Sequence, residues 1–293
     1  APLDRAFKLH SNIFEHQIVH TGQHYDVNMS DAFFHDLEMP QPTYFLGVGS
    51  GSHAEQTAKI MLEFEKVCID SKPDLVIVVG DVNSTIACAL TAIKLGIKVA
   101  HVEAGLRSGD RSMPEEINRI ATDSICDYCF VTEQSGYDNL IKEGRDPGNV
   151  FLVGNTMIDS QYYALDKAKE SDILRKLKLI AKSFILVTLH RPSNVDTQEQ
   201  LKSILEIFSE FSSERKIVFP VHPRTRKNIS QFGLDYLIEH NQNIKLTEPL
   251  GYIDFLWLMM NSDFVLTDSG GIQEETTALG IPCITARTTT ERP

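Results

Sequence analysis

The sequence has little of what marks nucleic-acid-binding or membrane-spanning proteins. Lys and Arg number 28 among 293 residues against 40 Asp and Glu, which gives a formal net charge of −12. Binding to a nucleic-acid backbone depends on clustered Lys and Arg, and the chain has no basic run. No apolar run approaches the roughly 20 residues that cross a bilayer. We therefore expect neither nucleic acid nor a membrane among its partners.

Cysteine is also scarce. The five cysteines are odd in number and stand in apolar contexts, which fits a reducing cytoplasm better than secretion. The one close pair is Cys126 and Cys129, and we expect two packed thiols rather than a redox or zinc site. The chain has no HExxH motif, and the segment with His16, His20 and His24 does not have a helical pattern. We therefore expect no metal.

The motifs of the common cofactor-binding and hydrolase sites are missing too. The sequence contains neither GxGxxG nor GxxxxGK[ST], so it offers no support for a dinucleotide cofactor or a P-loop. It has no GxSxG turn, which argues against a serine hydrolase. We expect no cofactor. A small anionic ligand remains compatible with the acidic charge, because a few placed donors are enough to bind one.

What the chain does have is a regular alternation of short apolar runs with longer runs of helical period. The runs expected to be strands are 74–80, 98–103, 128–132, 150–153, 184–189, 216–221, 244–246, 264–267 and 281–285. Continuous Val and Ile runs are typical of parallel strands buried on both faces. Alternation with helices predicts an α/β fold with doubly wound parallel sheets.

One stretch interrupts this alternation and predicts two domains. Residues 158–179 form a long amphipathic run without a strand, so we place the boundary there, with domains at 1–165 and 166–293. Two Rossmann-like domains of this kind facing each other would bind a ligand in the cleft between them, at the carboxyl ends of the strands.

Polar residues follow several of the expected strands directly. They are Asp81, Glu103, His190 with Arg191, His222, and Asp268. A single Asp at a strand end is more often a helix cap or a turn former. Five such positions together favour a functional site, because caps do not require His, and this edge of a parallel sheet is where such folds build sites.

The segment DSGGIQEE (268–275) is the sharpest local signal. Gly270 and Gly271, at a strand-to-helix turn, let the backbone approach a ligand, and the helix start then offers free N–H groups to an anion. Ser269 can add a hydroxyl. Glu275, one turn into the helix, is placed to accept hydrogen bonds from two neighbouring hydroxyls such as those of a ribose. The alternative is an ordinary tight turn.

The segment MPEEINR (113–119) is a second signal. Glu115 and Glu116 could simply balance the helix dipole, and Glu115 could pair with Arg119 one turn on. With Asp81 and Glu103, however, these residues bring several carboxylates to one region. Carboxylates held close together raise one another's pKa, which suits them to proton transfer.

These segments resemble the non-hydrolysing UDP-N-acetylglucosamine 2-epimerase family. The similar stretches run in order over nearly the whole chain: VVGDVNST (78–85), HVEAGLRSGDRSMPEEINR (101–119), VGNTMID (153–159), VTLHRPSN (187–194), FPVHPRTR (219–226) and LTDSGGIQEETTALGIPCITARTTTERP (266–293). The resemblance implies the GT-B fold, in which two Rossmann-like domains face each other across a cleft. It also implies a cytoplasmic homodimer that acts in polysaccharide biosynthesis.

The resemblance implies a reaction and its residues. UDP-GlcNAc and UDP-ManNAc interconvert without metal or nicotinamide: a base removes the C2 proton as UDP leaves C1, and UDP then re-adds to a 2-acetamidoglucal. Asp81, Glu103, Glu115 and His190 match the catalytic residues, with base and acid unassigned.

The resemblance also implies the substrate contacts. Ser269, Gly270 and Gly271 match the pyrophosphate turn, Glu275 the ribose carboxylate and Phe255 a uracil contact. Arg119 and Arg292 match arginines that place phosphate, and we add the strand-end residues Arg191 and His222. Gln23 and His24, in the 23–25 turn, are candidates for allosteric binding of UDP-GlcNAc.

The chain departs from the family pattern at both ends. Family members begin with a strand, a GTRPE-type turn that supplies an Arg and a Lys to the site, and a helix ending KMAPL. Ala1-Pro2-Leu3 resembles only the end of that helix, and the family continues past Pro293 into further helices. We expect the first strand and these helices to lie outside the 293 residues.

Several other activities stay open at this level. Hydrolysing epimerases release ManNAc and UDP, and other relatives act on UDP-2,3-diacetamido-glucuronate. A UDP-sugar-binding protein without activity is a further alternative, although all four catalytic-type residues are present. A GT-B glycosyltransferase would not need the carboxylates of HVEAGLR and PEEINR.

Overall fold

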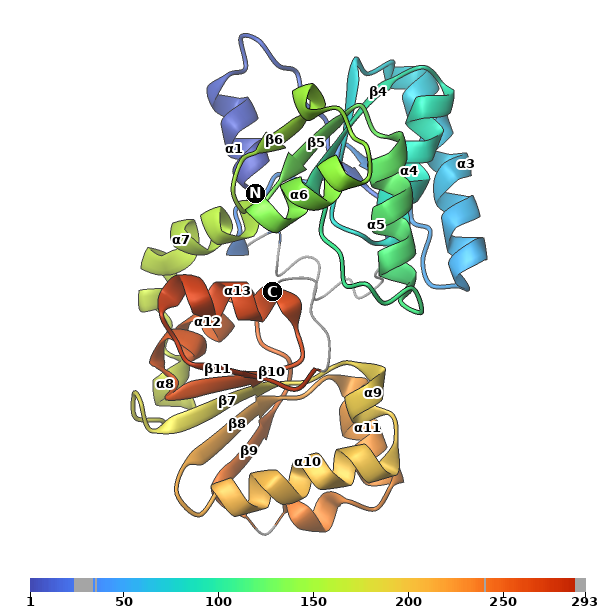
Figure 1. Cartoon of the computed structure of the whole chain (residues 1–293). Coiled ribbons are helices and arrows are strands. Elements are labelled where there is room, and N and C mark those ends of the chain that lie inside the picture. Colours follow the sequence, from blue (N-terminus) through green and yellow to red (C-terminus); the bar gives the residue numbers. More distant parts are fainter. Residues whose placement is uncertain (24–33, 35, 240, 288–293) are drawn as a thin grey trace. The chain divides into compact units, whose positions relative to one another are not determined.

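The computed structural model describes residues 1–23, 34, 36–239 and 241–287 and divides into two compact units (Figure 1). The first unit includes Glu38–Thr156 and the described residues at the N-terminal end, and the second includes residues 157–287. Asp36 and Leu37 belong to the second unit. The division falls at the start of helix α7 (Thr156–Lys169), whereas the boundary expected from the sequence, 165, lies inside this helix.

The first unit is built on a four-stranded parallel sheet in the order β3-β4-β5-β6. Its strands are β3 (Leu75–Val79), β4 (Lys98–Ala104), β5 (Tyr128–Val131) and β6 (Val150–Leu152). Consecutive strands are joined through α4 (Asn83–Lys94), α5 (Pro114–Ile125), and α6 (Gln134–Lys142) with the 3-10 turn η1 (Pro147–Asn149). Parallel neighbours need such crossovers, so all carboxyl ends of these strands lie at one edge.

Among the residues that the structure describes, four elements precede this sheet. They are α1 (Pro2–Leu9), β1 (Val19–His20), β2 (Tyr44–Phe45) and α3 (His53–Ser71), and β1 pairs with β2 in parallel. Helix α3 begins with a capping box, in which the Ser52 side chain accepts from the Glu55 N–H and the Glu55 carboxylate accepts from the Ser52 N–H. These bonds satisfy donors that the first helical turn leaves open.

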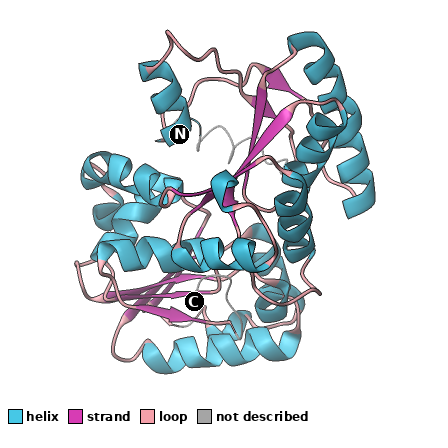
Figure 2. Ribbon diagram, turned by 45° about the horizontal axis from the view of Figure 1, so that its top comes forward, coloured by secondary structure: helices cyan, strands magenta, loops and turns pink. Residues whose placement is uncertain are grey.

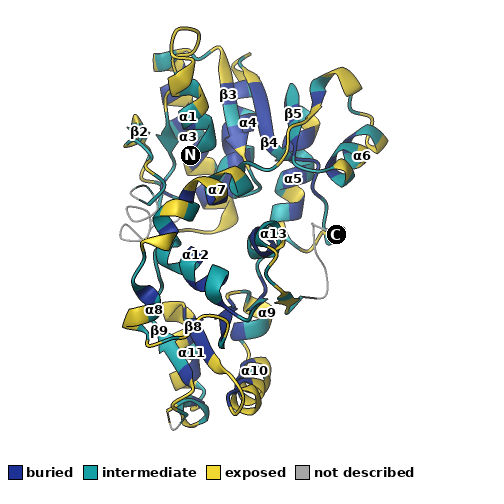
Figure 3. Cartoon of the chain, turned by 90° about the vertical axis from the view of Figure 1, so that its left-hand side faces the viewer, coloured by how far each residue is buried: buried dark blue, intermediate teal, exposed yellow. Residues whose placement is uncertain are grey.

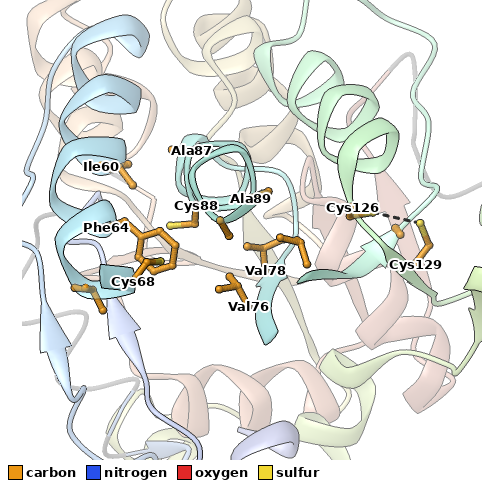
Figure 4. Packing of buried hydrophobic residues seen from close by; sticks show 14 of the residues in the cluster. Ile60, Phe64, Cys68, Val76, Val78, Ala87, Cys88, Ala89, Cys126 and Cys129 are labelled. Carbon is orange, nitrogen blue, oxygen red and sulfur yellow. Dashed lines mark hydrogen bonds between the residues drawn. The ribbon is translucent and has the colours of Figure 1, made fainter. Parts of the chain in front are cut away.

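The core of the first unit lies where α3 and α4 pack with β3. Figure 4 shows Ile60, Phe64 and Cys68 of α3 directed toward the small residues Ala87, Cys88 and Ala89 of α4 and toward Val76 and Val78. Small side chains on α4 allow the close approach of α3. Buried Cys126 and Cys129 belong to the same cluster and are free thiols, with their Sγ atoms 3.4 Å apart, as expected from their apolar surroundings.

The second unit is a five-stranded parallel sheet in the order β11-β10-β7-β8-β9. Its strands are β7 (Phe184–Thr188), β8 (Lys216–Pro220), β9 (Ile244–Thr247), β10 (Phe264–Thr267) and β11 (Cys283–Thr285). The sheet grows outward from β7 in one direction through β8 and β9, and in the other through β10 and β11. The strand order therefore reverses between β7 and β10, and open α/β sheets bind ligands at such a switch point.

The helices of the second unit cover this sheet (Figure 2). They are α7, α8 (Ile173–Lys176), α9 (Pro192–Val195), α10 (Gln198–Phe211), α11 (Pro223–Gln231), η2 (Asp235–Leu237), α12 (Tyr252–Asn261) and α13 (Gly270–Leu279). The amphipathic run expected over 158–179 contains two helices, α7 and α8, and no strand. Ser171 separates them, and its hydroxyl accepts from the Ile173 N–H at 3.2 Å, which opens α8.

Burial follows the periods that the sequence predicts (Figure 3). The first four residues of β7 are buried, whereas α10 buries only Leu201, Leu205 and Phe208 along one face. In the described part of the chain, no helix has both the length and the apolar character to cross a membrane. The α/β class with two Rossmann-like parallel-sheet units is confirmed.

Candidate active site

The switch point of the second unit holds an aspartate and a histidine from neighbouring strands. Asp268 follows β10 and is fully buried, and His190 follows β7 with about half of its side chain exposed. The Nδ1 of His190 lies 3.0 Å from Oδ1 of Asp268, and the His190 N–H donates to Oδ2 at 3.1 Å. Because a carboxylate only accepts, Nδ1 carries the hydrogen of this contact, which leaves Nε2 of a neutral ring as an acceptor.

Asp268 is held as a carboxylate by several donors. Burial alone would raise the pKa of Asp268, but hydrogen bonds from the His190 ring, the Asn194 amide and the Arg191 N–H lower it below its ordinary value. Sequence reasoning placed Asp268 in the DSGG segment but assigned it no role. The missed signal is its position at the switch point, beside the strand that ends in His190.

The turn after Asp268 opens helix α13. Ser269 is its N-cap residue, and the Ser269 N–H donates to the Thr267 hydroxyl at 3.0 Å. Gly270 is buried, and a Cβ on Gly271 would lie 3.3 Å from the Met157 sulfur. The N–H groups of the first turn have no carbonyl partner within the helix, which makes this end suited to an anion.

Glu275, on the same helix, is almost completely buried. Its Oε1 accepts a hydrogen bond from the Tyr252 hydroxyl at 2.8 Å. Burial raises the pKa of Glu275 to about 7, against the opposing effect of the Tyr252 hydrogen bond. Tyr252 was not foreseen from the sequence. Phe255, the expected uracil contact, is half-buried one turn further along α12 and packs on the core of the second unit.

Arg191 and His222 have structural partners of their own. Arg191 donates through Nε to the Asp268 carbonyl at 2.9 Å and so braces the DSGG turn. The Nδ1 of His222 accepts from the Arg224 N–H at 3.2 Å, which makes His222 the N-cap of α11. A His that follows a strand can therefore have the structural role of a helix cap, because an imidazole nitrogen without a hydrogen is also an acceptor.

In the first unit, Arg119 binds two carboxylates. Its Nη2 donates to Oδ2 of Asp81 at 2.6 Å and its Nη1 to Oε2 of Glu116 at 2.8 Å. Arg119 and Glu116 are buried, whereas Asp81 keeps about a third of its side chain exposed. Asp81 follows β3, and its carbonyl also accepts from the Asn118 amide at 2.8 Å. The arrangement fixes Asp81 and leaves part of its carboxylate open to a ligand.

The partner of Arg119 on α5 is Glu116, not Glu115. A pair between Glu115 and Arg119 was the structural alternative considered for this helix, and Glu116, three residues from Arg119, takes that place. Glu116 also accepts from the N–H groups of Ser108 and Gly109, each at 3.0 Å. Burial would raise the pKa of Glu116, but these donors together with Arg119 lower it. Glu115 stays half-buried on the neighbouring face of α5.

Glu103 has a backbone conformation that is rare outside glycine. Its φ is 68°, and the register between β4 and β5 shifts between Val102 and Ala104. A bulge at this point re-aims the side chain that follows a strand, and such conformations cluster at functional sites. Asp81 follows β3, and Glu103 is the sixth residue of the adjacent paired strand β4, so both stand near the carboxyl edge of the sheet.

Three further residues were expected at binding sites from the sequence: Gln23, His24 and Arg292. The Gln23 side chain accepts from the Ser84 N–H at 2.8 Å and from its hydroxyl at 2.6 Å, beside the start of α4. His24 and Arg292 lie outside the described residues. Their roles, like the allosteric role of Gln23, stay predictions.

One described cluster has the spacing of metal ligands: buried His101, Asp123 and Cys126. Asp123 already accepts from the His101 ring at 2.6 Å and from Arg107 at 2.7 Å. An arginine on the carboxylate opposes a second cation, so these residues do not fit a metal. Of the three histidines near the start, His16 contacts Asp4 at 2.9 Å and His20 stacks on Phe45.

Comparison with known proteins identifies the family to which the chain is similar. The UDP-N-acetylglucosamine 2-epimerase family model matches residues 7–293. UDP-N-acetylglucosamine 2-epimerase of Methanocaldococcus jannaschii is 47% identical over 100% of this chain and 81% of its own length. UDP-2,3-diacetamido-2,3-dideoxy-D-glucuronate 2-epimerase of Pseudomonas aeruginosa is 43% identical over 94% of this chain and 75% of its own.

A solved structure is similar over the same range. The M. jannaschii UDP-GlcNAc 2-epimerase in complex with UDP-GlcNAc and UDP has a TM-score of 0.90 and 46% identity, covering 99% of this chain and 80% of that one. Family and fold agree with the resemblance seen in the sequence. The chain belongs to the UDP-N-acetylglucosamine 2-epimerase family, a family of isomerases.

Proposed function

We propose that the protein interconverts UDP-GlcNAc and UDP-ManNAc without net hydrolysis. The observation that carries the proposal is the identity of 47% to an epimerase of this name over the whole chain. The proposed catalytic residues are Asp81, Glu103, Glu115 and His190, the last of which Asp268 orients. UDP-sugar is the proposed substrate and needs no further cofactor.

In the proposed reaction a carboxylate of the first unit removes the proton at C2 while the bond between C1 and the UDP oxygen breaks. UDP leaves with the bonding electrons, and 2-acetamidoglucal remains in the site. UDP then adds back to C1, and a proton is delivered to the other face of C2. Charge develops on the diphosphate as it leaves, where N–H groups at the start of α13 and arginine side chains can stabilise it.

Most of the proposed nucleotide contacts belong to the second unit. The diphosphate would bind Ser269, Gly270 and Gly271 with Arg191, and His222, Arg119 and Arg292 complete the expected contacts. Glu275 would accept from the ribose hydroxyls and Phe255 would contact uracil. The Tyr252 hydroxyl now on Glu275 sets the orientation of that carboxylate. We place the protein in the cytoplasm, on the evidence of its free cysteines, and expect a homodimer.

The similarity to the P. aeruginosa enzyme makes UDP-2,3-diacetamido-glucuronate the second candidate substrate. Chromatography of products after separate incubation with the two UDP-sugars tests the choice. The proposal predicts UDP-ManNAc from UDP-GlcNAc and little turnover of the uronate, and a D81N variant should abolish the product. The reverse preference, or free ManNAc with UDP as the only products, would contradict it.

A further inference from the structure

Behind the carboxylates of the first unit lies a buried histidine that the proposed chemistry does not use. His101 is the fourth residue of β4 and is completely buried. Its Nδ1 lies 2.6 Å from Oδ1 of Asp123 on α5, and its Nε2 lies 2.8 Å from the carbonyl oxygen of Gly80. Gly80 immediately precedes Asp81, so the ring connects helix α5 to the backbone of a catalytic-type residue.

The partners decide the protonation of the ring. A carbonyl oxygen can only accept, so Nε2 carries a hydrogen. Asp123 also accepts at Oδ2 from Arg107 Nη1 at 2.7 Å and from the Gly105 N–H at 3.0 Å, which keeps it a carboxylate. The second ring nitrogen must then donate as well, and His101 is an imidazolium.

The charges around the ring agree with this state. Burial would lower the pKa of His101, but the hydrogen bond and charge of Asp123, with the Gly80 carbonyl, raise it above its ordinary value. Two thiols are the other ionisable groups near the ring: Cys129 of β5 and Cys126, which caps the end of α5. The contact with Cys129, together with burial, raises the pKa of the Cys126 thiol. Arg107, on the far side of Asp123, is held in turn by Glu143 at 2.6 Å.

The network reaches the backbone at three places that surround the candidate catalytic residues. His101 holds the Gly80 carbonyl next to Asp81. Asp123 holds the Gly105 N–H, two residues after the bulge at Glu103. Arg107 donates to the Leu106 carbonyl at 2.7 Å. A buried ion pair by itself contributes little net stability, so its attachment to these turns points to positioning.

We propose that His101, held as an imidazolium by Asp123, is a positioning residue that fixes the turns carrying Asp81 and Glu103 for proton transfer at C2. The expected kinetic effects rest on the proposed epimerase function. The protonation of the His101 ring does not depend on that function.

The first test is spectroscopic and needs no activity. Nitrogen-15 NMR of the histidine-labelled protein, with H101Q used for assignment, reads the protonation of both ring nitrogens. At pH 8, well above the ordinary pKa of about 6.5, we expect both His101 nitrogens to be protonated. A neutral ring at that pH would overturn the proposal, and this measurement stands whether or not the protein epimerises any UDP-sugar.

The second test compares two replacements. The amide of Gln can reach the Gly80 carbonyl in place of Nε2, whereas the amide of Asn reaches only Asp123 in place of Nδ1. H101N should lose roughly 100-fold in kcat, as expected when a reacting group is misplaced, and H101Q only about 10-fold, for the loss of one hydrogen bond to a charged group. UDP affinity should be unchanged in both, because the hydrogen-bond partners of His101, Asp123 and Gly80, are not among the proposed nucleotide contacts.

The control is H10N, at an exposed histidine that follows α1, which should keep wild-type kcat. Circular dichroism and urea unfolding identify the folded fraction of each variant. Equal kcat for folded H101N and wild type, or losses that track the folded fraction alone, would overturn the positioning role. If wild type itself turned over no UDP-sugar, the proposed function would fail while the NMR result still decided the state of His101.

Discussion

Asp268 holds His190 at two points at once, through the ring Nδ1 at 3.0 Å and through the backbone N–H at 3.1 Å. Double attachment fixes both the position and the tautomer of the imidazole. His190 can therefore offer Nε2 to a bound ligand without searching among rotamers, and it can take up a proton next to a buried carboxylate. The pair sits where the strand order of the second sheet reverses, which is the expected place for a ligand.

Replacement of Asp268 should impair catalysis more than binding. In D268N the amide can donate to Nδ1 and favour the wrong tautomer, so we expect kcat to fall by roughly 100-fold or more with a small change in UDP affinity. Steady-state kinetics and UDP titration measure the two effects. The control D263N removes an exposed pair with Arg215 in the same unit and should change neither. Equal losses in the two variants would refute the assigned role.

Replacement of Arg119 should cost stability as well as activity. R119M leaves buried Glu116 with its two N–H donors but without its cation, and removes the tether of Asp81. We expect a loss of about 3–5 kcal/mol in the free energy of unfolding, as for other broken buried pairs. Urea unfolding of R119M and of the surface control R215M, expected to lose about 1 kcal/mol or less, makes the comparison. Similar losses would show that Arg119 is not a buried bridge.

The raised pKa of Glu275 predicts that the stability of the protein depends on pH, and burial of the carboxyl group decides the sign. Its pKa is raised from 4.5 to about 7, so the folded protein binds a proton that the unfolded chain has released over this range. The stability that Glu275 contributes is therefore complete below about pH 4.5 and is lost as the pH rises through about 7. E275Q should become more stable than wild type by up to about 3 kcal/mol at pH 8, and should match it near pH 4.5. Parallel stability curves from pH 4.5 to 8 would contradict this.

Gly105 and Gly109 form a matched pair for testing the turn after β4. Both have positive φ, 80° and 72°, but a Cβ on Gly105 would lie 2.2 Å from the Gly136 carbonyl oxygen, and a Cβ on Gly109 would meet nothing within 4 Å. G109A should lose only the conformational cost of about 1–2 kcal/mol. G105A must also displace backbone and should lose clearly more, with reduced kcat because Asp123 binds the Gly105 N–H. Thermal unfolding of the two variants measures the difference.

Much of the fold follows from the periodicity of apolar residues and from the residues that end helices and strands. The expected strand 264–267 coincides with β10, and the other expected strands agree with the structure to within one or two residues at each end. Continuous apolar runs identify strands buried on both faces without knowledge of their neighbours. The break at 170–172 between α7 and α8 has no clear signal in the sequence, because polar residues at these positions also fit the exposed face of an amphipathic run.

The sequence predicted which positions carry candidate site residues, but not which of these side chains contact one another. Strand-end residues gather at one edge in any parallel sheet, so Asp81, Glu103 and His190 could be selected from the sequence alone. The choice of Glu116 over Glu115 by Arg119 depends on which face of α5 is buried, and that depends on packing. The pair of His190 and Asp268 depends on strand order, because residues far apart in the chain become neighbours only when β7 pairs with β10.

The proposed epimerase reaction requires the protein to break the bond to hydrogen at C2 of a UDP-sugar and to restore it on the other face. Proton NMR of UDP-GlcNAc incubated with the protein in deuterium oxide tests it most directly. If the proposed reaction occurs, we expect loss of the C2 proton signal through deuterium incorporation, together with the growth of UDP-ManNAc signals. UDP-ManNAc with the original proton retained at C2, or bound UDP-GlcNAc that stays unchanged, would contradict it.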